Sequence, residues 1–80
     1  MHYVYILQSI NAPDQYYTGI TADLKKRLEA HNNGQSPHTA KHRPWRLVSY
    51  VAFADEAKAQ AFEKYLKSGS GRAFAAKRLR

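Results

Sequence analysis

The segment that decides the fold spans residues 2–20 and reads HYVYILQSINAPDQYYTGI. Its first part is rich in β-branched and aromatic residues. These alternate between two faces, with Tyr3, Tyr5 and Leu7 on one face and Val4 and Ile6 on the other. Successive side chains of a strand point to opposite faces of a sheet, so the alternation predicts a strand over residues 2–8.

A second strand follows after a turn. The stretch from Ser9 to Gln15 contains Pro13 and Asp14, which favour turns, and it leads into an aromatic and β-branched run that begins at Tyr16. Two such runs joined by a loop of medium length predict a β-hairpin. We expect its second strand to end near Thr21.

A helix is predicted directly after the hairpin. Thr21 can cap a helix over about residues 22–32, in which Leu24 and Leu28 lie one turn apart. Asn33-Gly34 marks its end, because Gly readily adopts the backbone conformation that terminates a helix.

The next segments predict a loop and a third strand. Residues 35–46 contain two prolines and no sustained hydrophobic period, which is typical of an exposed loop. β character returns over Leu47–Phe53.

Two helices complete the chain. Asp55 can cap the first of them, which stops near Ser68-Gly69. The apolar face of this helix is formed by Ala59, Phe62, Tyr65 and Leu66. A short final helix, from about Arg72 to Leu79, places Phe74 and Leu79 inward.

The predicted order of elements is ββαβαα, which indicates an α/β fold with a small three-stranded antiparallel sheet flanked by helices. Hydrophobic residues make up 44% of the chain and aromatic residues 12%, a composition that can fill a core. Eighty residues suffice for one core but not for two. We therefore expect residues 1–80 to form a single domain.

The charge of the chain points to a polyanionic partner. Thirteen Lys and Arg against six Asp and Glu give a formal net charge of +7, which favours binding to nucleic acid. A membrane surface is a weaker alternative, because the alanine-rich C-terminal tail lacks bulky apolar residues opposite its basic ones.

Other classes of protein are disfavoured by what the sequence lacks. There is no cysteine, which excludes disulfides and Cys-based zinc sites. The start lacks the basic region and long apolar run of a signal peptide, and no apolar run approaches membrane-spanning length. We expect a soluble, cytoplasmic protein.

Residues far apart in the chain form a recognisable constellation. Tyr3-Val4-Tyr5 and Tyr17-Thr18-Gly19 lie on the hairpin, Arg27 and His31 on the next helix, and Glu63 on a later one. In residue type and spacing this pattern resembles the GIY-YIG endonucleases, and it covers most of the chain. The resemblance is closest to small stand-alone bacterial members and to the related structure-specific junction endonucleases.

Arg27 and His31 have a physical interpretation independent of that resemblance. Four residues apart, they share one helical face with Leu24 and Leu28. A charge at the edge of a core needs an anion, and a phosphate suits the planar fork of Arg. The alternative is that Arg27 lies along the sheet and pairs with an Asp or Glu from another segment.

The resemblance implies a metal-dependent endonuclease that hydrolyses phosphodiester bonds in DNA. It implies that Glu63 ligates Mg²⁺ or Mn²⁺, that Arg27 holds the phosphate, and that Tyr5 is the general base for the attacking water. A phenol is a weak base at its ordinary pKa of about 10, so Tyr5 needs a nearby cation or needs His31 to accept its proton. Tyr17 would hydrogen-bond water or phosphate, and Gly19 would let the phosphate approach the strand.

Each of these residues also has a structural interpretation. Strand tyrosines such as Tyr5 and Tyr17 are commonly packing residues, and a helical Glu such as Glu63 is commonly a solvated surface residue. Only their joint occurrence favours a site.

The chain departs from the family pattern in two ways: Tyr3 stands where the family name has Gly, and no Asn follows Asn33. Neither Ser68 nor Ser70 can be assigned as a substitute for that Asn.

Basic residues flank the predicted site and are candidates for contacts to the nucleic-acid backbone. They are Lys41, His42, Arg43 and Arg46 in the loop and Arg72 and Lys77 in the tail. The alternative is a generic basic surface.

Trp45 fits the core better than a stack on an unpaired base. A zinc site at His38 and His42 is disfavoured, because Pro37 and Pro44 oppose a helix there.

Two functions remain open at this point. The first is an endonuclease that selects DNA structure over base sequence, because so small a domain carries no separate specificity module. The second is a non-cleaving nucleic-acid-binding module that keeps the fold, which the missing Asn favours.

Overall fold

The structure is a computed structural model that describes residues 1–80. Its centre is an antiparallel sheet of three strands in the order β2-β1-β3. The strands are β1 (His2–Ser9), β2 (Tyr16–Thr21) and β3 (Trp45–Phe53), and β1 is the middle one. The predicted hairpin is confirmed, since Tyr3 pairs with Thr21 and Gln8 with Tyr16.

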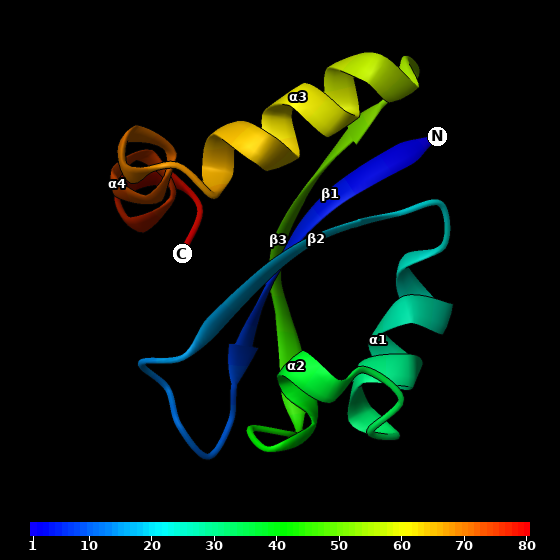
Figure 1. Cartoon of the computed structure of the whole chain (residues 1–80), viewed down its shortest axis with the longest axis vertical. Coiled ribbons are helices and arrows are strands. Elements are labelled where there is room, and N and C mark those ends of the chain that lie inside the picture. The colour runs from blue at the N-terminus through cyan, green and yellow to red at the C-terminus, as the bar shows by residue number, and fades with distance from the viewer.

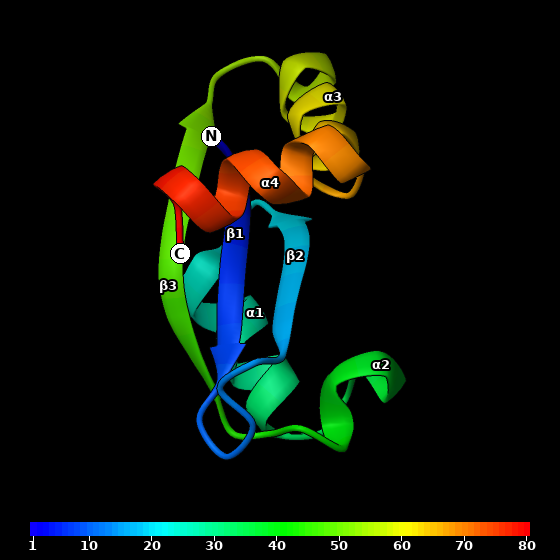
Figure 2. The same ribbon diagram turned by 90° about the vertical axis from the view of Figure 1, so that its left-hand side faces the viewer.

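Four helices surround the sheet. They are α1 (Leu24–Asn32), α2 (Pro37–Ala40), α3 (Glu56–Leu66) and α4 (Gly69–Arg78). The helix α1 lies on one side of the sheet and α3 and α4 lie on the other (Figure 1). The short α2 lies at the opposite end of the molecule from α3 (Figure 2). The predicted α/β class is therefore confirmed, with one additional helix in the order ββααβαα. None of the helices combines the length and apolar character needed to cross a membrane.

The middle strand is buried on both faces, which explains why both sets of its alternating residues are apolar or aromatic. On one face Val4 and Ile6 pack with Ala59, Leu66 and Ala75 from α3 and α4. On the other face Tyr5 and Leu7 pack with Trp45, and Leu24 and Leu28 of α1 cover them. Burial of apolar surface on both faces fixes the register of β1, because a slip by one residue would exchange the two sets.

The cap of α1 differs from the sequence-based prediction. Asp23, not Thr21, is the N-cap, and its carboxylate accepts the backbone N–H of Lys26 at 3.0 Å. The Thr21 hydroxyl instead accepts the backbone N–H of Asp23 at 3.1 Å. Thr21 thus holds the turn that precedes the helix, and the stronger acceptor, a carboxylate, caps the helix itself.

The prediction of an exposed loop over residues 35–46 is confirmed only in part. Pro37–Ala40 forms α2, and Ser36 and Thr39 are buried. Trp45 is also buried, as expected, and its indole N–H donates to the Thr39 carbonyl at 2.8 Å. Pro37 favours this helix because the first helical turn needs no N–H from that position. A helix of four residues is too short to leave a periodic signal in the sequence.

The final helix also begins earlier than predicted. Ser68 caps it by accepting the backbone N–H of Gly71 at 3.2 Å, so the helix starts at Gly69 rather than Arg72. Leu79 packs inward as expected, but Phe74 does not, since 38% of it is exposed. Tyr65 of α3 is likewise more exposed than its helical position suggested.

Small residues form the buried side of α4 because the helix approaches the end of α3 closely. Gly71 and Ala75 are buried, and a Cβ atom placed on Gly71 would overlap the carbonyl group of Tyr65. Large apolar residues of α4 are therefore excluded from this contact and remain at the surface.

We predict that Gly71→Ala lowers the free energy of unfolding by about 1–3 kcal/mol, since α4 must shift away from α3 to accommodate the methyl group. Gly69→Ala is the matched control, because a Cβ atom there has no neighbour within 4 Å. It should raise the free energy of unfolding by up to about 1 kcal/mol through helix propensity. Urea denaturation measures both, and equal effects of the two changes would contradict the close contact.

Candidate functional site

Tyr5 occupies the position around which the candidate site is built. It is directly opposite Gly19 in the pairing of β1 with β2, and only 2% of it is exposed. A Cβ atom on Gly19 would overlap the hydroxyl end of the Tyr5 ring. The glycine was expected to make room for a phosphate, but the group that occupies this space in the structure is the phenol of Tyr5.

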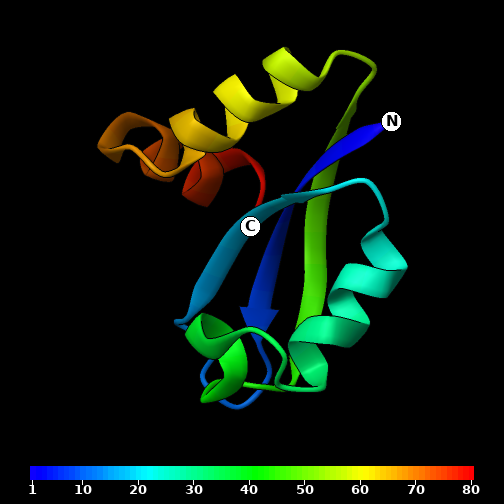
Figure 3. The ribbon, with the colours of Figure 1, turned by 45° about the vertical axis from the view of Figure 1, so that its right-hand side comes forward.

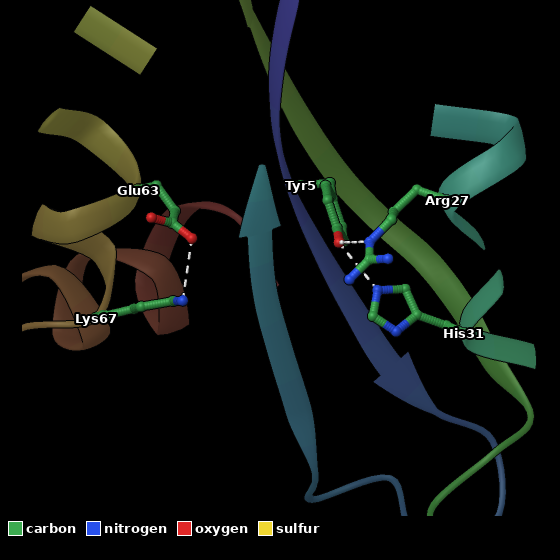
Figure 4. Close-up of polar contacts among 5 residues, drawn as sticks. All are labelled: Tyr5, Arg27, His31, Glu63 and Lys67. Carbon is green, nitrogen blue, oxygen red and sulfur yellow. Dashed lines mark hydrogen bonds and ion pairs between the residues drawn. The ribbon is translucent and has the colours of Figure 1, made fainter. Parts of the chain in front are cut away.

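The Tyr5 hydroxyl contacts both side chains that α1 was expected to supply. Arg27 donates from Nε to the phenol oxygen at 3.3 Å, and His31 Nε2 lies 2.9 Å from the same oxygen (Figure 4). The four-residue spacing on α1 points both side chains at one atom of the sheet. Arg27 forms no ion pair with an Asp or Glu, so the alternative considered for it is not found.

The contacts determine which nitrogen of His31 carries the proton. Arg27 can only donate to the phenol oxygen, and Nε2 of His31 is the one other group in hydrogen-bond contact with it, so the buried phenol proton points to Nε2, which acts as acceptor. On the other side of the ring, Nδ1 lies 2.8 Å from the Thr39 hydroxyl, which donates in turn to the Ser36 carbonyl at 3.4 Å. The Thr39 oxygen therefore accepts from Nδ1–H. Both constraints require the same neutral tautomer.

The electrostatics of the cluster favour neutral Tyr5 and neutral His31. Burial raises the pKa of Tyr5, although the hydrogen bond and charge of Arg27 act against this. Burial lowers the pKa of His31, and the charge of Arg27 lowers it further. The hydrogen bond with Tyr5 raises the pKa of Arg27, which remains a cation. The resting cluster is thus a neutral phenol between a neutral imidazole and a guanidinium.

Tyr17 forms the side of the cluster that lies toward the edge of the sheet. It is half-buried, and its ring centroid lies 6.3 Å from that of Tyr5 and 5.0 Å from that of His31. Lys67 at the end of α3 places its ammonium 5.9 Å from the centroid of the Tyr17 ring. Tyr17 therefore connects the cluster with the helices on the other side of β2.

Glu63 lies apart from these residues. Its carboxylate pairs with Lys67 at 3.0 Å, and in the view of Figure 4 strand β2 passes between this pair and Tyr5, Arg27 and His31. Glu63 is close enough for its negative charge to contribute to the raised pKa of Tyr5, as the least of the causes. No group of three or more His, Cys, Asp or Glu side chains gathers in the structure. A cation at Glu63 would therefore have one protein carboxylate as ligand.

The structure thus brings Tyr5, Tyr17, Arg27 and His31 together and leaves Glu63 across the edge strand. Two contributors were missed by the sequence analysis. Thr39 was assigned to an exposed loop, and no local pattern marks it as a partner of His31. Lys67 could have been found, because a Lys four residues after a Glu on a helix is a standard ion-pair spacing.

The predicted backbone-binding residues occupy two regions. In the first, Lys41 is exposed and the Arg43 side chain lies against Gly34, while Arg46 donates to the side chain of Gln8. His42 is half-buried, with its ring edge toward Trp45. In the second region, Arg72 and Lys77 are both exposed on α4.

Comparisons with known proteins agree with this architecture. A family model of the GIY-YIG catalytic domain matches residues 1–77. A UPF0213 protein of Clostridium perfringens is 41% identical over 68 residues, which cover 84% of this chain and 71% of that protein. A UPF0213 protein of Lacticaseibacillus paracasei is 37% identical over 67 residues, which cover 82% of this chain and 73% of that protein.

A solved structure supports the same assignment. The solution NMR structure of a UPF0213 protein from Bacillus halodurans is similar with a TM-score of 0.56 and 32% identity, and the match covers 95% of this chain and 82% of that chain. The chain belongs to the GIY-YIG family, and through this catalytic domain to a superfamily of nucleases, which act on nucleic acids.

We predict that ¹⁵N spectra of the folded protein at neutral pH show His31 protonated at Nδ1 and unprotonated at Nε2. Thr39→Val removes the acceptor for Nδ1–H and should lower the free energy of unfolding by about 1–3 kcal/mol, because a buried donor loses its partner. Thr39→Ser keeps the hydroxyl and should preserve the tautomer. A proton on Nε2 in the wild type would contradict this arrangement.

The lowered pKa of His31 predicts a loss of stability in mild acid. As the pH falls below the ordinary histidine pKa of roughly 6.5, the unfolded chain binds a proton at this position before the folded chain does, so the free energy of unfolding decreases. Urea denaturation between about pH 7.5 and about pH 5.5 measures this slope. His31→Gln should make it shallower, and an unchanged slope in that variant would show that another group is responsible.

Proposed function

We propose that this protein is an endonuclease that hydrolyses phosphodiester bonds in DNA with the help of Mg²⁺ or Mn²⁺. The observation that supports the proposal most strongly is the Tyr5 hydroxyl, whose oxygen contacts Arg27 Nε at 3.3 Å and His31 Nε2 at 2.9 Å. Hydrolysis requires a site for the phosphate and an acceptor for a proton of the attacking water, and this cluster offers both.

Arg27 is the proposed phosphate ligand. Its Nε–H is used by Tyr5, which leaves the terminal N–H groups of the guanidinium for a bidentate contact with phosphate. The hydrogen bond to Tyr5 also fixes the plane of the guanidinium in advance of binding. Such preorganisation reduces the entropy lost when the substrate binds.

Tyr5 and His31 together are the proposed general base. The raised pKa of Tyr5 opposes a resting phenolate, so a free phenolate is not the acceptor. Instead, Tyr5 takes a proton from water while its own proton passes to Nε2 of His31, and no charge has to reside on the phenol. Binding of an anionic phosphate at Arg27 would offset the charge that lowers the pKa of His31, which favours this transfer once substrate is present.

Glu63 is the proposed ligand of the divalent cation. Mg²⁺ in enzymes that act on phosphates is commonly held by one or two carboxylates together with waters and phosphate oxygens, so a single carboxylate fits this cation. When bound, the cation supplies positive charge to the scissile phosphate and the leaving oxygen. The Lys67 ammonium, which neutralises Glu63 in the structure, has to move from the carboxylate for the cation to bind.

We propose that the protein selects its DNA substrate by the shape of the backbone and not by the base sequence. The net charge of +7 favours contacts with phosphates, which give affinity without sequence information. The apolar faces of α1 and α3 pack on the sheet, and nothing in the chain resembles a dedicated groove-reading helix. Branched or flapped DNA is the substrate class that fits these properties.

A non-cleaving nucleic-acid-binding module is the second candidate. Two observations favour it: Glu63 pairs with Lys67 on the far side of β2 from the Tyr5 cluster, and no Asn follows Asn33 in the chain. In such a module Arg27 would still bind phosphate, and binding would not depend on a divalent cation.

We predict that the wild type cleaves branched DNA in the presence of Mg²⁺ and that Glu63→Gln lowers the rate by roughly 100-fold or more, an effect comparable to the loss of one electrostatic contact in a catalytic site. Glu56→Gln, which makes the same change at an exposed position in the first turn of α3, should retain activity. Initial rates on labelled branched and linear duplexes measure the effect.

Two results would contradict the endonuclease. Equal cleavage by wild type and Glu63→Gln would assign the activity to another site or to a contaminant. Absence of cleavage, combined with metal-independent binding that Arg27→Ala weakens, would establish the non-cleaving module instead.

A further inference from the structure

A groove separates the β1–β2 hairpin from α3 and α4, on the face of the sheet opposite Tyr5. Its volume is about 700 Å³, and Ile6, Leu66 and Ala75 form its apolar floor. One wall is strand β2 from Tyr16 to Thr18, and the other consists of the end of α3 and the inner side of α4. We call this hollow the C-terminal groove.

The C-terminal groove is lined by three cations, Lys67, Arg72 and Arg80, and by one acid, Asp14. Neither Arg72 nor Arg80 forms an ion pair with a carboxylate, and Arg72 is exposed. The Arg80 guanidinium lies 4.3 Å from the centroid of the Tyr16 ring, which holds the end of the chain beside β2 (Figure 3). Two arginines without an ion-pair partner thus line one hollow, and planar forks of this kind suit phosphate oxygens.

Tyr17 lies between the C-terminal groove and the candidate site. This residue lines the groove, and its ring also lies 5.0 Å from the ring of His31. Lys67 lines the groove as well and approaches the ring of Tyr17. Tyr17 and Lys67, which is paired with Glu63, thus lie between the groove and the side chains of the Tyr5 cluster.

We propose that the C-terminal groove binds the phosphate backbone of one nucleic-acid strand that extends from the candidate site. The proposal rests on the proposed function for the position of the strand. Arg72 and Arg80 hold phosphates. The face of Tyr16 is covered by Arg80 and offers no platform for a base, so the contacts are with the backbone and are independent of sequence.

The structure separates the basic residues of α4 and of the segment after it into two groups that the sequence does not distinguish. Arg72 and Arg80 line the groove, whereas Lys77 and Arg78 do not. The lysines Lys58 and Lys64 of α3 are exposed, form no ion pair and also lie outside the groove. These two lysines provide a charge-matched control.

The test compares the double variant Arg72→Gln/Arg80→Gln with Lys58→Gln/Lys64→Gln. Binding of a fluorescent single-stranded DNA oligonucleotide is measured by anisotropy without divalent cation. The groove variant should bind about tenfold more weakly, and its dependence of log K on log salt should be shallower by about 1.4, which corresponds to two lost phosphate contacts at about 0.7 each. The control variant should change affinity by less than about twofold.

Equal weakening in the two variants would show that only net charge matters and would overturn the proposal, as would unchanged binding in the groove variant. Circular dichroism and urea denaturation establish that both variants are folded. Because binding is measured without cleavage, failure of the endonuclease proposal leaves this comparison valid. Failure of the groove proposal would in turn leave the cleavage test on Glu63→Gln unaffected, because that test depends on the cation site and not on Arg72 or Arg80.

Discussion

The hydroxyl of Tyr5 is the constraint on which the candidate site depends. Tyr5 belongs to the middle strand, and because that strand is buried on both faces, its polar atom can be satisfied only by groups that α1 brings to it. Arg27 and His31 form these hydrogen bonds, and the bonds fix the positions of both side chains. The site is therefore part of the core packing, and its geometry is as rigid as the attachment of α1 to the sheet.

This arrangement extends to residues with no direct contact with the phenol. The buried Thr39 receives the second ring nitrogen of His31, and its carbonyl receives the indole of Trp45. The segment around α2 thus holds the side of the imidazole that faces away from Tyr5, and it links this ring to the start of β3. A short helix that contributes little to the hydrophobic core acquires its importance through two hydrogen bonds, because each one satisfies a buried polar group that would otherwise be destabilising.

Positive charge is distributed over both sides of the sheet, and strand β2 is where the two sides meet. Arg27 lies with α1 on one side, and Lys67, Arg72 and Arg80 lie with α3 and α4 on the other. Edge strands expose one side to solvent, and here Tyr17 on that edge lies beside His31 of one side and Lys67 of the other. The same edge separates Glu63 from the Tyr5 cluster, so the position of α3 relative to β2 determines how closely an acid and the phosphate-binding guanidinium can cooperate.

The sequence by itself determined the hairpin, the third strand and three of the four helices, because alternation, helical spacing and capping residues are local properties of the chain. The grouping of Tyr5, Tyr17, Arg27 and His31 followed from the resemblance of their pattern to the GIY-YIG endonucleases. It could not identify α2, the burial of Thr39 or the outward position of Phe74, which depend on contacts between distant segments. Only the tertiary structure decided that Glu63 and Lys67 lie across β2 from the Tyr5 cluster and that Arg72 and Arg80 share a groove. The physical reason is that spacing along a helix specifies which face a side chain occupies, whereas the packing of helix on sheet specifies what that face meets.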